Sequence, residues 1–167
     1  MQPIHETSDW KMAESRLGPN RLAGDYAWKS IGGAGARLAF GSDFPVENPN
    51  PLPGLAAAIS REDVNSQPAG GWQPQEKVSR EAALDGFTRS AAFAGFAEDR
   101  LGTLEPGKRA DFVLLDVDPM TASPKQIWNG KVVETWVDGQ RAYVAGATAG
   151  EKALPPQNSP QNPPKGR

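Results

Sequence analysis

Residues 101–118 read LGTLEPGKRADFVLLDVD. Within this stretch, residues 105–108 (EPGK) are a strong turn sequence, because proline fixes one turn angle and glycine accepts the positive φ that follows. The run from Phe112 to Val117 is rich in strand-forming residues and ends at Asp118-Pro119. The spacing of apolar residues changes here from a helical to an extended pattern, which predicts that a β unit begins after Asp99.

The sequence downstream of this stretch predicts a β-hairpin. Residues 132–137 (VVETWV) alternate between two faces, and residues 141–144 (RAYV) form a second extended run. Between them, Asp138-Gly139 supplies the residues that accept positive φ in a tight turn. Beyond Gly146 the composition falls to Ala, Gly, Pro, Gln and Asn without an apolar period, so residues 147–167 are predicted to be a disordered tail.

A clear helical period lies upstream, over residues 80–94. The apolar residues that keep the helical spacing are Leu84, Phe87, Ala91 and Ala94. Ser79 precedes them as a good N-cap, since its hydroxyl can accept a hydrogen bond from a first-turn amide. Asp85 and Arg89 face each other at i, i+4. These features predict one helix over the whole range.

Two shorter helices are predicted near the N-terminus. Apolar residues at helical spacing predict a helix from Thr7 to Leu17, which Gly18-Pro19 ends. A second helical stretch is predicted from Arg21 to about Ile31, ahead of Gly32-Gly33. The order of elements here is therefore helix, helix and then an extended segment.

The extended segment is the short apolar run Arg37–Phe40, which leads into Gly41-Ser42-Asp43. It predicts a buried strand that delivers a carboxylate at its C-terminal end. Four prolines disfavour regular structure over residues 44–54, which are predicted as a loop beside Asp43. A helical turn or two is expected over Leu55–Ile59, and residues 61–78 are predicted as an irregular surface loop.

The composition excludes several kinds of functional site and partner. The 167 residues carry a formal net charge of -2 and 38% hydrophobic residues, which suits one ordinary domain or one and a part. The absence of cysteine and the single histidine exclude disulfides, thiol nucleophiles and sites built from several imidazoles. Basic and acidic residues are balanced and no apolar run could span a membrane, so neither nucleic acid nor a membrane is an expected partner. No signal peptide begins at Met1, which makes the cytoplasm the default location, and an export signal of a longer parent would lie upstream.

Two residues are candidates for a functional site. Asp43 follows a predicted buried strand and opens a proline-rich loop, where α/β barrels place catalytic and metal-binding groups. The alternative is that Ser42 and Asp43 only turn the chain, as Ser and Asp often do. His5, the single imidazole, could be a ligand, an acid–base group, a substrate contact or a structural residue. Residue patterns by themselves leave these alternatives open.

Five segments, taken in order, resemble the C-terminal portion of an amidohydrolase-superfamily protein. They are residues 2–5 (QPIH), 16–18 (RLG), 41–46 (GSDFPV), the helix from Ser79, and 101–111 (LGTLEPGKRAD). More narrowly, the sequence resembles the amidohydrolase 3 branch that includes N-substituted formamide deformylases. The last segment is the most specific, because in this superfamily it marks the return of the chain from the barrel to a small β domain.

The resemblance implies an α/β fold, namely the C-terminal fragment of a (β/α)8 TIM barrel followed by part of a small β-sandwich domain. Residues 1–98 would be the last two β/α units of the hydrolase barrel. Residues 99–146 would be a β-strand unit of the composite β domain, and the tail would occupy 147–167. In this alignment His5 falls where the seventh barrel strand ends, and Asp43 matches the Asp at the end of the last strand.

The resemblance also implies a metal-dependent hydrolase that acts on carbon–nitrogen bonds other than peptide bonds. Its substrate would be a small-molecule amide or formamide, and a full-length parent would hold a divalent metal, with zinc expected. Asp43 would bind the metal and act as the general base for the attacking water, then pass the proton to the leaving nitrogen. His5 would be a substrate-binding residue of the pocket.

The chain also departs from the family pattern. A whole barrel needs about 250 residues, and no His-x-His pair is present, so the chain is expected to be an incomplete fragment that lacks most metal ligands. On this view it is inactive alone. The alternative is a non-catalytic truncated protein or interaction fragment, and a complementing chain that supplies the missing strands is a further candidate partner.

Overall fold

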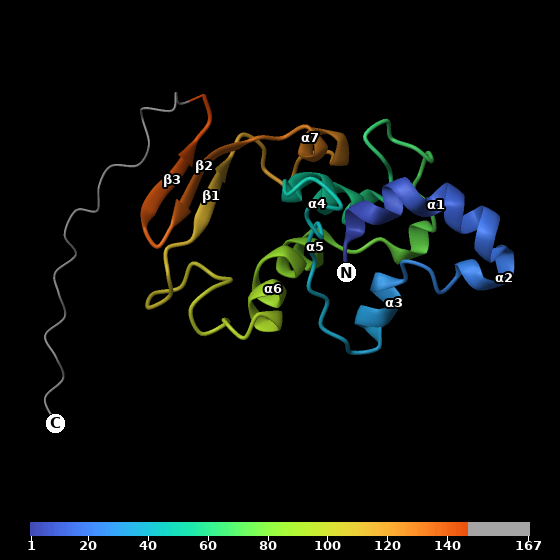
Figure 1. The fold of residues 1–167 in the computed structure, drawn as a ribbon, viewed down its shortest axis with the longest axis horizontal. Helices are drawn as coiled ribbons and strands as arrows, with labels where there is room; N and C mark the ends of the chain where they lie inside the picture. Colours follow the sequence, from blue (N-terminus) through green and yellow to red (C-terminus); the bar gives the residue numbers. More distant parts are fainter. Residues whose placement is uncertain (147–167) are drawn as a thin grey trace, which may run out of the picture.

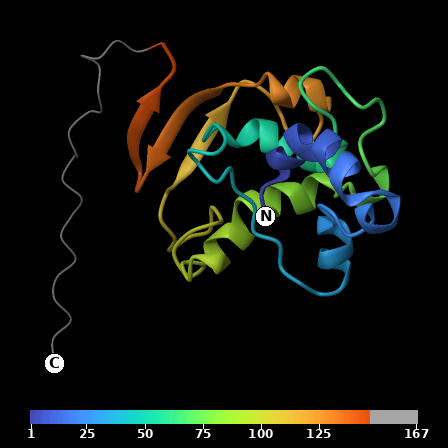
Figure 2. The ribbon, with the colours of Figure 1, turned by 45° about the vertical axis from the view of Figure 1, so that its right-hand side comes forward.

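The structure is a computed structural model that describes residues 1–146 and combines helices with one small antiparallel sheet (Figure 1). The tail predicted over residues 147–167 lies outside the described residues. Along the chain the elements are α1 (Pro3–Leu17), α2 (Pro19–Leu22), α3 (Trp28–Gly33), α4 (Pro51–Ser60), the 3-10 helix η1 (Pro74–Glu76), α5 (Arg80–Phe87), α6 (Arg89–Ala94), β1 (Phe112–Leu115), α7 (Pro124–Trp128), β2 (Val132–Val137) and β3 (Gln140–Val144). Figures 1 and 2 show the sheet at one end of the molecule, helices α1 to α3 at the other, and α4 to α6 between them, with α7 beside α4. Within the described part of the chain, no helix is both long enough and apolar enough to cross a membrane.

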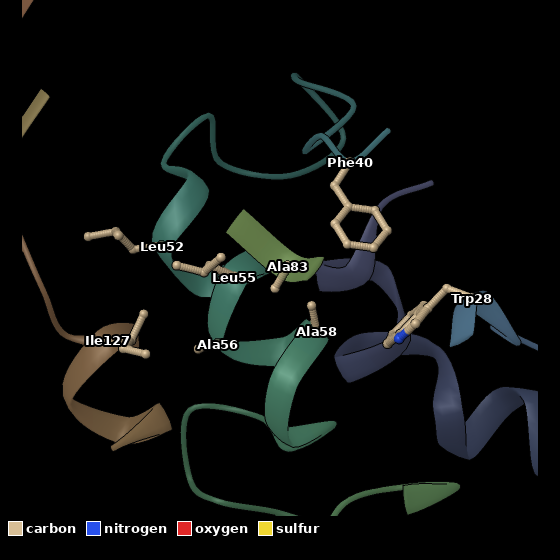
Figure 3. Close-up of a cluster of buried hydrophobic side chains, with 8 residues drawn as sticks. All are labelled: Trp28, Phe40, Leu52, Leu55, Ala56, Ala58, Ala83 and Ile127. Carbon is tan, nitrogen blue, oxygen red and sulfur yellow. The ribbon is translucent and has the colours of Figure 1, made fainter. Parts of the chain in front are cut away.

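Helix α4 lies at the centre of the hydrophobic core, because its sequence PLPGLAAAIS carries apolar or small residues on every face. Helices α1, α5 and α7 all pack against it. Figure 3 shows the buried side chains that gather around this helix, which are Trp28, Phe40, Leu52, Leu55, Ala56, Ala58, Ala83 and Ile127. The segments before and after α4 are therefore held by a rigid, fully covered element.

The loop predicted over residues 44–54 is shorter than expected, because α4 already begins at Pro51. Proline is tolerated in the first turn of a helix, where the amide that it lacks would have no partner within the helix. Asn50 caps the helix, since its side chain accepts a hydrogen bond from the amide of Leu52 at 3.1 Å. The loop after Asp43 therefore ends at a capped, buried helix.

The N-terminal helix also starts earlier than predicted, at Pro3 instead of Thr7. Pro3 occupies the first helical position, for which its fixed φ is suited. The end of α1 at Leu17 is confirmed, and Gly18 follows it with a φ of 71°. The longer α1 brings Glu6 into the helix, and its side chain is one of the few in α1 that are buried.

The single helix predicted over residues 21–31 is wrong. Helix α2 ends at Leu22 and α3 begins at Trp28, and between them Tyr26 adopts a φ of 50°. The carbonyl of Tyr26 accepts a hydrogen bond from Arg61 Nη1 at 3.0 Å. This bond joins residues far apart in the sequence, so local helical spacing could not reveal the break.

The helix predicted over residues 80–94 is two helices, α5 and α6, separated at Thr88, whose φ and ψ are -125° and -88°. The Ser79 cap is confirmed, since its hydroxyl accepts from the amide of Ala82 at 3.1 Å. The i, i+4 ion pair between Asp85 and Arg89 is also confirmed, at 3.3 Å. The break has a tertiary cause.

The carbonyl of Gly86 accepts a hydrogen bond from the amide of Phe40 at 2.9 Å. In an uninterrupted helix this carbonyl would accept from the amide four residues later, so the bond to Phe40 competes with continuation of α5. Gly86 is buried, and it allows the ring of Phe40 to lie directly against the α5 backbone. The extended segment before Asp43 is thus attached to the helical layer at this point.

Replacing Gly86 with Ala is expected to destabilise the fold by about 1–3 kcal/mol, because overpacking forces a buried neighbour to move. The added methyl would overlap Cδ2 of Phe40 and lie 2.8 and 2.9 Å from Cε2 and Cγ. Thermal unfolding followed by circular dichroism measures the effect. Gly33→Ala is the matched control, since nothing lies within 4 Å of the added group, and an equal loss of stability in both variants would contradict the prediction.

The β unit predicted after residue 99 is confirmed. The turn at residues 105–108 closes with a hydrogen bond from the amide of Lys108 to the carbonyl of Glu105 at 3.1 Å. Strands β1, β2 and β3 form an antiparallel sheet in that order. The predicted hairpin turn has Asp138 at a φ of 55° and Gly139 at 72°, which suits the mirror-image turns that join adjacent strands.

The strand predicted over Arg37–Phe40 is wrong, since these residues are extended but belong to no ladder, and only Phe40 among them is buried. Helix α7 is an element that the prediction missed, although Ser123 and Gln126 form a capping box at its start. The described residues thus form a mixed helical structure with a small antiparallel sheet. The barrel and the division at residues 98 and 99 stay predictions.

Candidate functional site

The N-terminal residue lies alongside the segment that precedes Asp43. The amino group of Met1 donates to the carbonyl of Ala39 at 2.6 Å, and the amide of Gly41 donates to the carbonyl of Met1 at 3.2 Å. These two bonds lie on either side of Phe40, which is the pattern of neighbouring residues in a parallel pair. The two segments therefore run in the same direction at this point, and His5 and Asp43 follow them in the sequence.

His5 follows the first of these segments and lies in the first turn of α1 instead of at the end of a strand. Its Nε2 atom is buried and has no hydrogen-bond partner in the described structure. Because the helix begins at Pro3, the imidazole is carried by a rigid element. The substrate-binding role predicted for His5 stays a prediction.

Asp43 follows the second segment and is exposed, with a φ of 55°. Its carbonyl accepts a hydrogen bond from the amide of Val46 at 2.8 Å. Asp43 therefore turns the chain, which was one of the two alternatives that the sequence left open. That role uses the backbone and leaves the carboxylate available. The side chains of Phe44 and Val46 are each 67% exposed beside it.

The loop after Asp43 is joined to α1 by one side-chain contact. Ser8 Oγ lies 3.4 Å from Glu47 Oε1. This contact and the Met1 bonds attach the start of α1 to both ends of the segment that carries Asp43. The two predicted residues, His5 and Asp43, are thus on neighbouring, connected segments.

The described residues do not build a complete metal centre. Among residues 1–146, no three His, Cys, Asp or Glu side chains come close enough together to hold a metal ion. A catalytic zinc normally has three protein ligands. Asp43 could supply one of them, so the remaining ligands would have to come from polypeptide other than these residues.

A buried polar cluster, which we call the Arg61 cluster, was missed by the sequence analysis. Arg61 is fully buried, although residues 61–78 were predicted to be a surface loop. Its Nε donates to the carbonyl of Trp72 and its Nη1 to that of Tyr26. The guanidinium lies 4.2 Å from the ring centre of Trp28 and 5.5 Å from that of Trp72, within the range of cation–π attraction.

Two carboxylates next to the Arg61 cluster have pKa values that are shifted in opposite directions. Burial raises the pKa of Glu6 to about 7, Arg61 opposes that rise, and Asp63 adds to it. Burial would also raise the pKa of Glu76, but hydrogen bonds from Ser30 and the charge of Arg61 outweigh it, so the pKa of Glu76 lies below its ordinary value. Glu76 therefore stays ionised while Glu6 is neutral over much of the range below neutrality.

Tyrosine and tryptophan side chains extend the Arg61 cluster to α1. The hydroxyl of Tyr26 donates to Asp9 at 2.7 Å, and the indole of Trp72 donates to Glu14 at 3.0 Å. Burial, followed by the bond to Asp9, raises the pKa of Tyr26. Two acidic side chains of α1, Asp9 and Glu14, thus accept hydrogen bonds from distant aromatic residues, which the spacing of apolar residues could not predict.

Comparison with known proteins assigns the chain to a family. The sequence model of the amidohydrolase family matches residues 1–143. The chain belongs to the amidohydrolase family. The resemblance found in the sequence is therefore confirmed.

The chain is 36% identical to Protein LONG AFTER FAR-RED 3 of Arabidopsis thaliana over 144 residues, which cover 86% of this chain and 24% of that protein. It is 31% identical to the N-substituted formamide deformylase of Arthrobacter pascens over 115 residues, covering 69% and 21% of the two chains. An uncharacterized metal-dependent hydrolase from Pyrococcus furiosus is structurally similar, with a TM-score of 0.59 and 35% identity, over 72% of this chain and 23% of that one. The amidohydrolase chain thus spans about a quarter of the length of the curated relatives that it matches.

Proposed function

We propose that this chain supplies one side of a hydrolytic site that cleaves carbon–nitrogen bonds other than peptide bonds, in small amides or formamides. The observation that supports the proposal is the parallel pairing of Met1 with the segment around Phe40, since His5 and Asp43 follow these two segments in the sequence. Barrel enzymes build their sites at the carboxyl ends of neighbouring parallel strands. The arrangement supports the assignment of residues 1–98 to the last two units of a (β/α)8 barrel.

The chemistry proposed for Asp43 is proton transfer. Its carboxylate accepts a proton from the water that attacks the carbonyl carbon and returns it to the nitrogen as the carbon–nitrogen bond breaks. The exposed position of Asp43 on a loop anchored by a capped helix leaves room for the substrate carbonyl. We expect His5 to contact the substrate as well, since its Nε2 has no hydrogen-bond partner among the described residues.

The metal that the family implies does not fit the described residues alone. Among the described residues, Asp43 would be its one ligand. The other ligands, for zinc or another divalent ion, would come from polypeptide outside residues 1–146. That polypeptide would be either a longer parent or a complementing chain.

The isolated chain is expected to bind much less than one equivalent of zinc and to hydrolyse no formamide. The physical reason is that a single carboxylate and a single imidazole cannot replace three protein ligands. Equilibrium dialysis at neutral pH followed by metal analysis measures the first result, and ammonia or amine release measures the second. One tightly bound equivalent of zinc would contradict the view that most ligands lie elsewhere.

A chimera tests the proposed function directly. The region of the Arthrobacter pascens deformylase that matches this chain is replaced by the corresponding residues of this chain. The chimera is expected to bind metal and to hydrolyse an N-substituted formamide, because the rest of the deformylase then supplies the metal ligands that this chain lacks. A chimera that is folded and metal-loaded but without turnover would contradict the proposal, and circular dichroism and metal analysis establish both conditions.

A further inference from the structure

The junction between α1 and the C-terminal end of α4 contains buried polar atoms without partners. Both carboxylate oxygens of Glu6, Nη2 of Arg61 and Nε1 of Trp28 make no hydrogen bond in the described structure. The side chains of all three residues are fully buried. Figure 3 shows Trp28 reaching from α3 into the cluster around α4. Acceptors without donors and donors without acceptors therefore occur in the same part of the core.

Arg61 is fixed and has one donor group to spare. Its Nε and Nη1 already bond to the carbonyls of Trp72 and Tyr26, and its plane lies over the ring of Trp28. A neutral carboxylic acid can remain buried there at a lower cost than an ionised one. An ionised carboxylate cannot remain buried without hydrogen-bond donors, because the loss of hydration is far larger for a charge.

We propose that Glu6 and Arg61 form a proton-operated contact that sets the position of α1 on α4. With Glu6 protonated, α1 keeps the position seen here. When Glu6 releases its proton to solvent, the carboxylate accepts from the free Nη2 of Arg61 and draws the first turn of α1 toward the end of α4. The device needs no metal and no substrate, so it is independent of the proposed hydrolysis.

The charged groups around the junction determine the pH at which Glu6 releases its proton. Burial raises the pKa of Glu6 to about 7, Arg61 lowers it and Asp63, just after α4, raises it. Burial lowers the pKa of Arg61, and the charges of Glu76 in η1 and of Asp25, before α3, oppose that fall. Because His5 is the neighbour of Glu6 in the same helical turn, movement of this turn also moves His5 relative to Asp43.

The test follows the indole N–H of Trp28 and the Nε–H of Arg61 by NMR in the whole chain, from about pH 5 to about pH 9. Both signals are expected to shift with one midpoint near neutrality, together with the carboxyl carbon of Glu6. Glu6→Gln is expected to abolish the shift, whereas His5→Gln and the exposed control Glu98→Gln retain it. Flat signals in the unaltered chain, persistence of the shift in Glu6→Gln, or its loss in His5→Gln would each overturn the proposal.

Stability gives a second readout of the same contact. The folded chain holds the Glu6 proton more tightly than the unfolded chain, so folding is favoured most below the ordinary carboxyl pKa and less as pH rises through 7. The melting temperature is therefore expected to fall over this range, and to fall less in Glu6→Gln. Equal pH dependence in the two proteins would overturn the proposal even if NMR signals could not be assigned.

Discussion

Replacing Asp43 with Asn in the formamide deformylase chimera is expected to lower kcat by about 10²–10⁴-fold, the usual contribution of a positioned general acid or base. Asn keeps the size of the side chain but cannot take up the proton of the attacking water. Because Asp43 is exposed on a turn whose hydrogen bond uses the backbone, the substitution leaves the local fold intact. Steady-state kinetics with an N-substituted formamide measures the effect.

The matched control for Asp43→Asn is Asp99→Asn, a second exposed aspartate on the same chain. It is expected to leave kcat unchanged. Metal content separates two causes of a loss in Asp43→Asn, since loss of metal indicates a ligand role and loss of rate with metal retained indicates proton transfer. Full activity of Asp43→Asn would remove Asp43 from the proposed site.

Replacing Arg61 with Ala is expected to lower the free energy of unfolding by about 3–5 kcal/mol, as for removal of one partner from a buried charged network. The substitution leaves the carbonyls of Tyr26 and Trp72 without their donor and removes the cation packed on Trp28. Urea unfolding followed by far-ultraviolet circular dichroism measures the loss. This probe is preferable to fluorescence, because the substitution itself changes the surroundings of two tryptophans.

Arg100→Ala is the control for Arg61→Ala, since Arg100 is exposed, and its free energy of unfolding is expected to change by no more than about 0.5 kcal/mol. A loss of similar size in both variants would mean that general charge, and not the Arg61 cluster, is responsible. Stability near that of the unaltered chain in Arg61→Ala would show that the cluster contributes little to folding.

The parts of the fold that sequence predicts well are those whose causes are local. The Asp138-Gly139 turn lies between two alternating runs, and the turn at residues 105–108 depends on its own proline and glycine. The Ser79 cap and the end of α1 at Leu17 are likewise set by residues beside them. None of these features requires contact with a distant segment.

The errors arise where a distant contact overrides local spacing. Tyr26 interrupts a predicted helix because its carbonyl bonds to Arg61, and Thr88 interrupts another next to the bond between Gly86 and Phe40. The predicted strand before Asp43 lacks a ladder, since Met1 is its one paired neighbour on that side within the described residues.

The same distinction between local causes and distant contacts applies to the candidate site. Asp43 could be singled out because a carboxylate after an apolar run is a local pattern, and it does lie at the predicted end of the segment. The Arg61 cluster could not, because charged residues are usually exposed and nothing near Arg61 in the sequence indicates burial. The signal that was available is the pair of tryptophans at 28 and 72, whose rings pack on Arg61.

The bonds that hold the helical layer together join residues widely separated along the chain. Glu14 and Trp72 are 58 positions apart, Ser30 and Glu76 are 46 apart, and Met1 and Ala39 are 38 apart. Strands β2 and β3, in contrast, are joined by a two-residue turn. Closing a long loop costs more conformational entropy than closing a two-residue hairpin turn. We therefore expect the β2–β3 hairpin to form early in folding, and the helical layer, which carries His5 and Asp43, to form later.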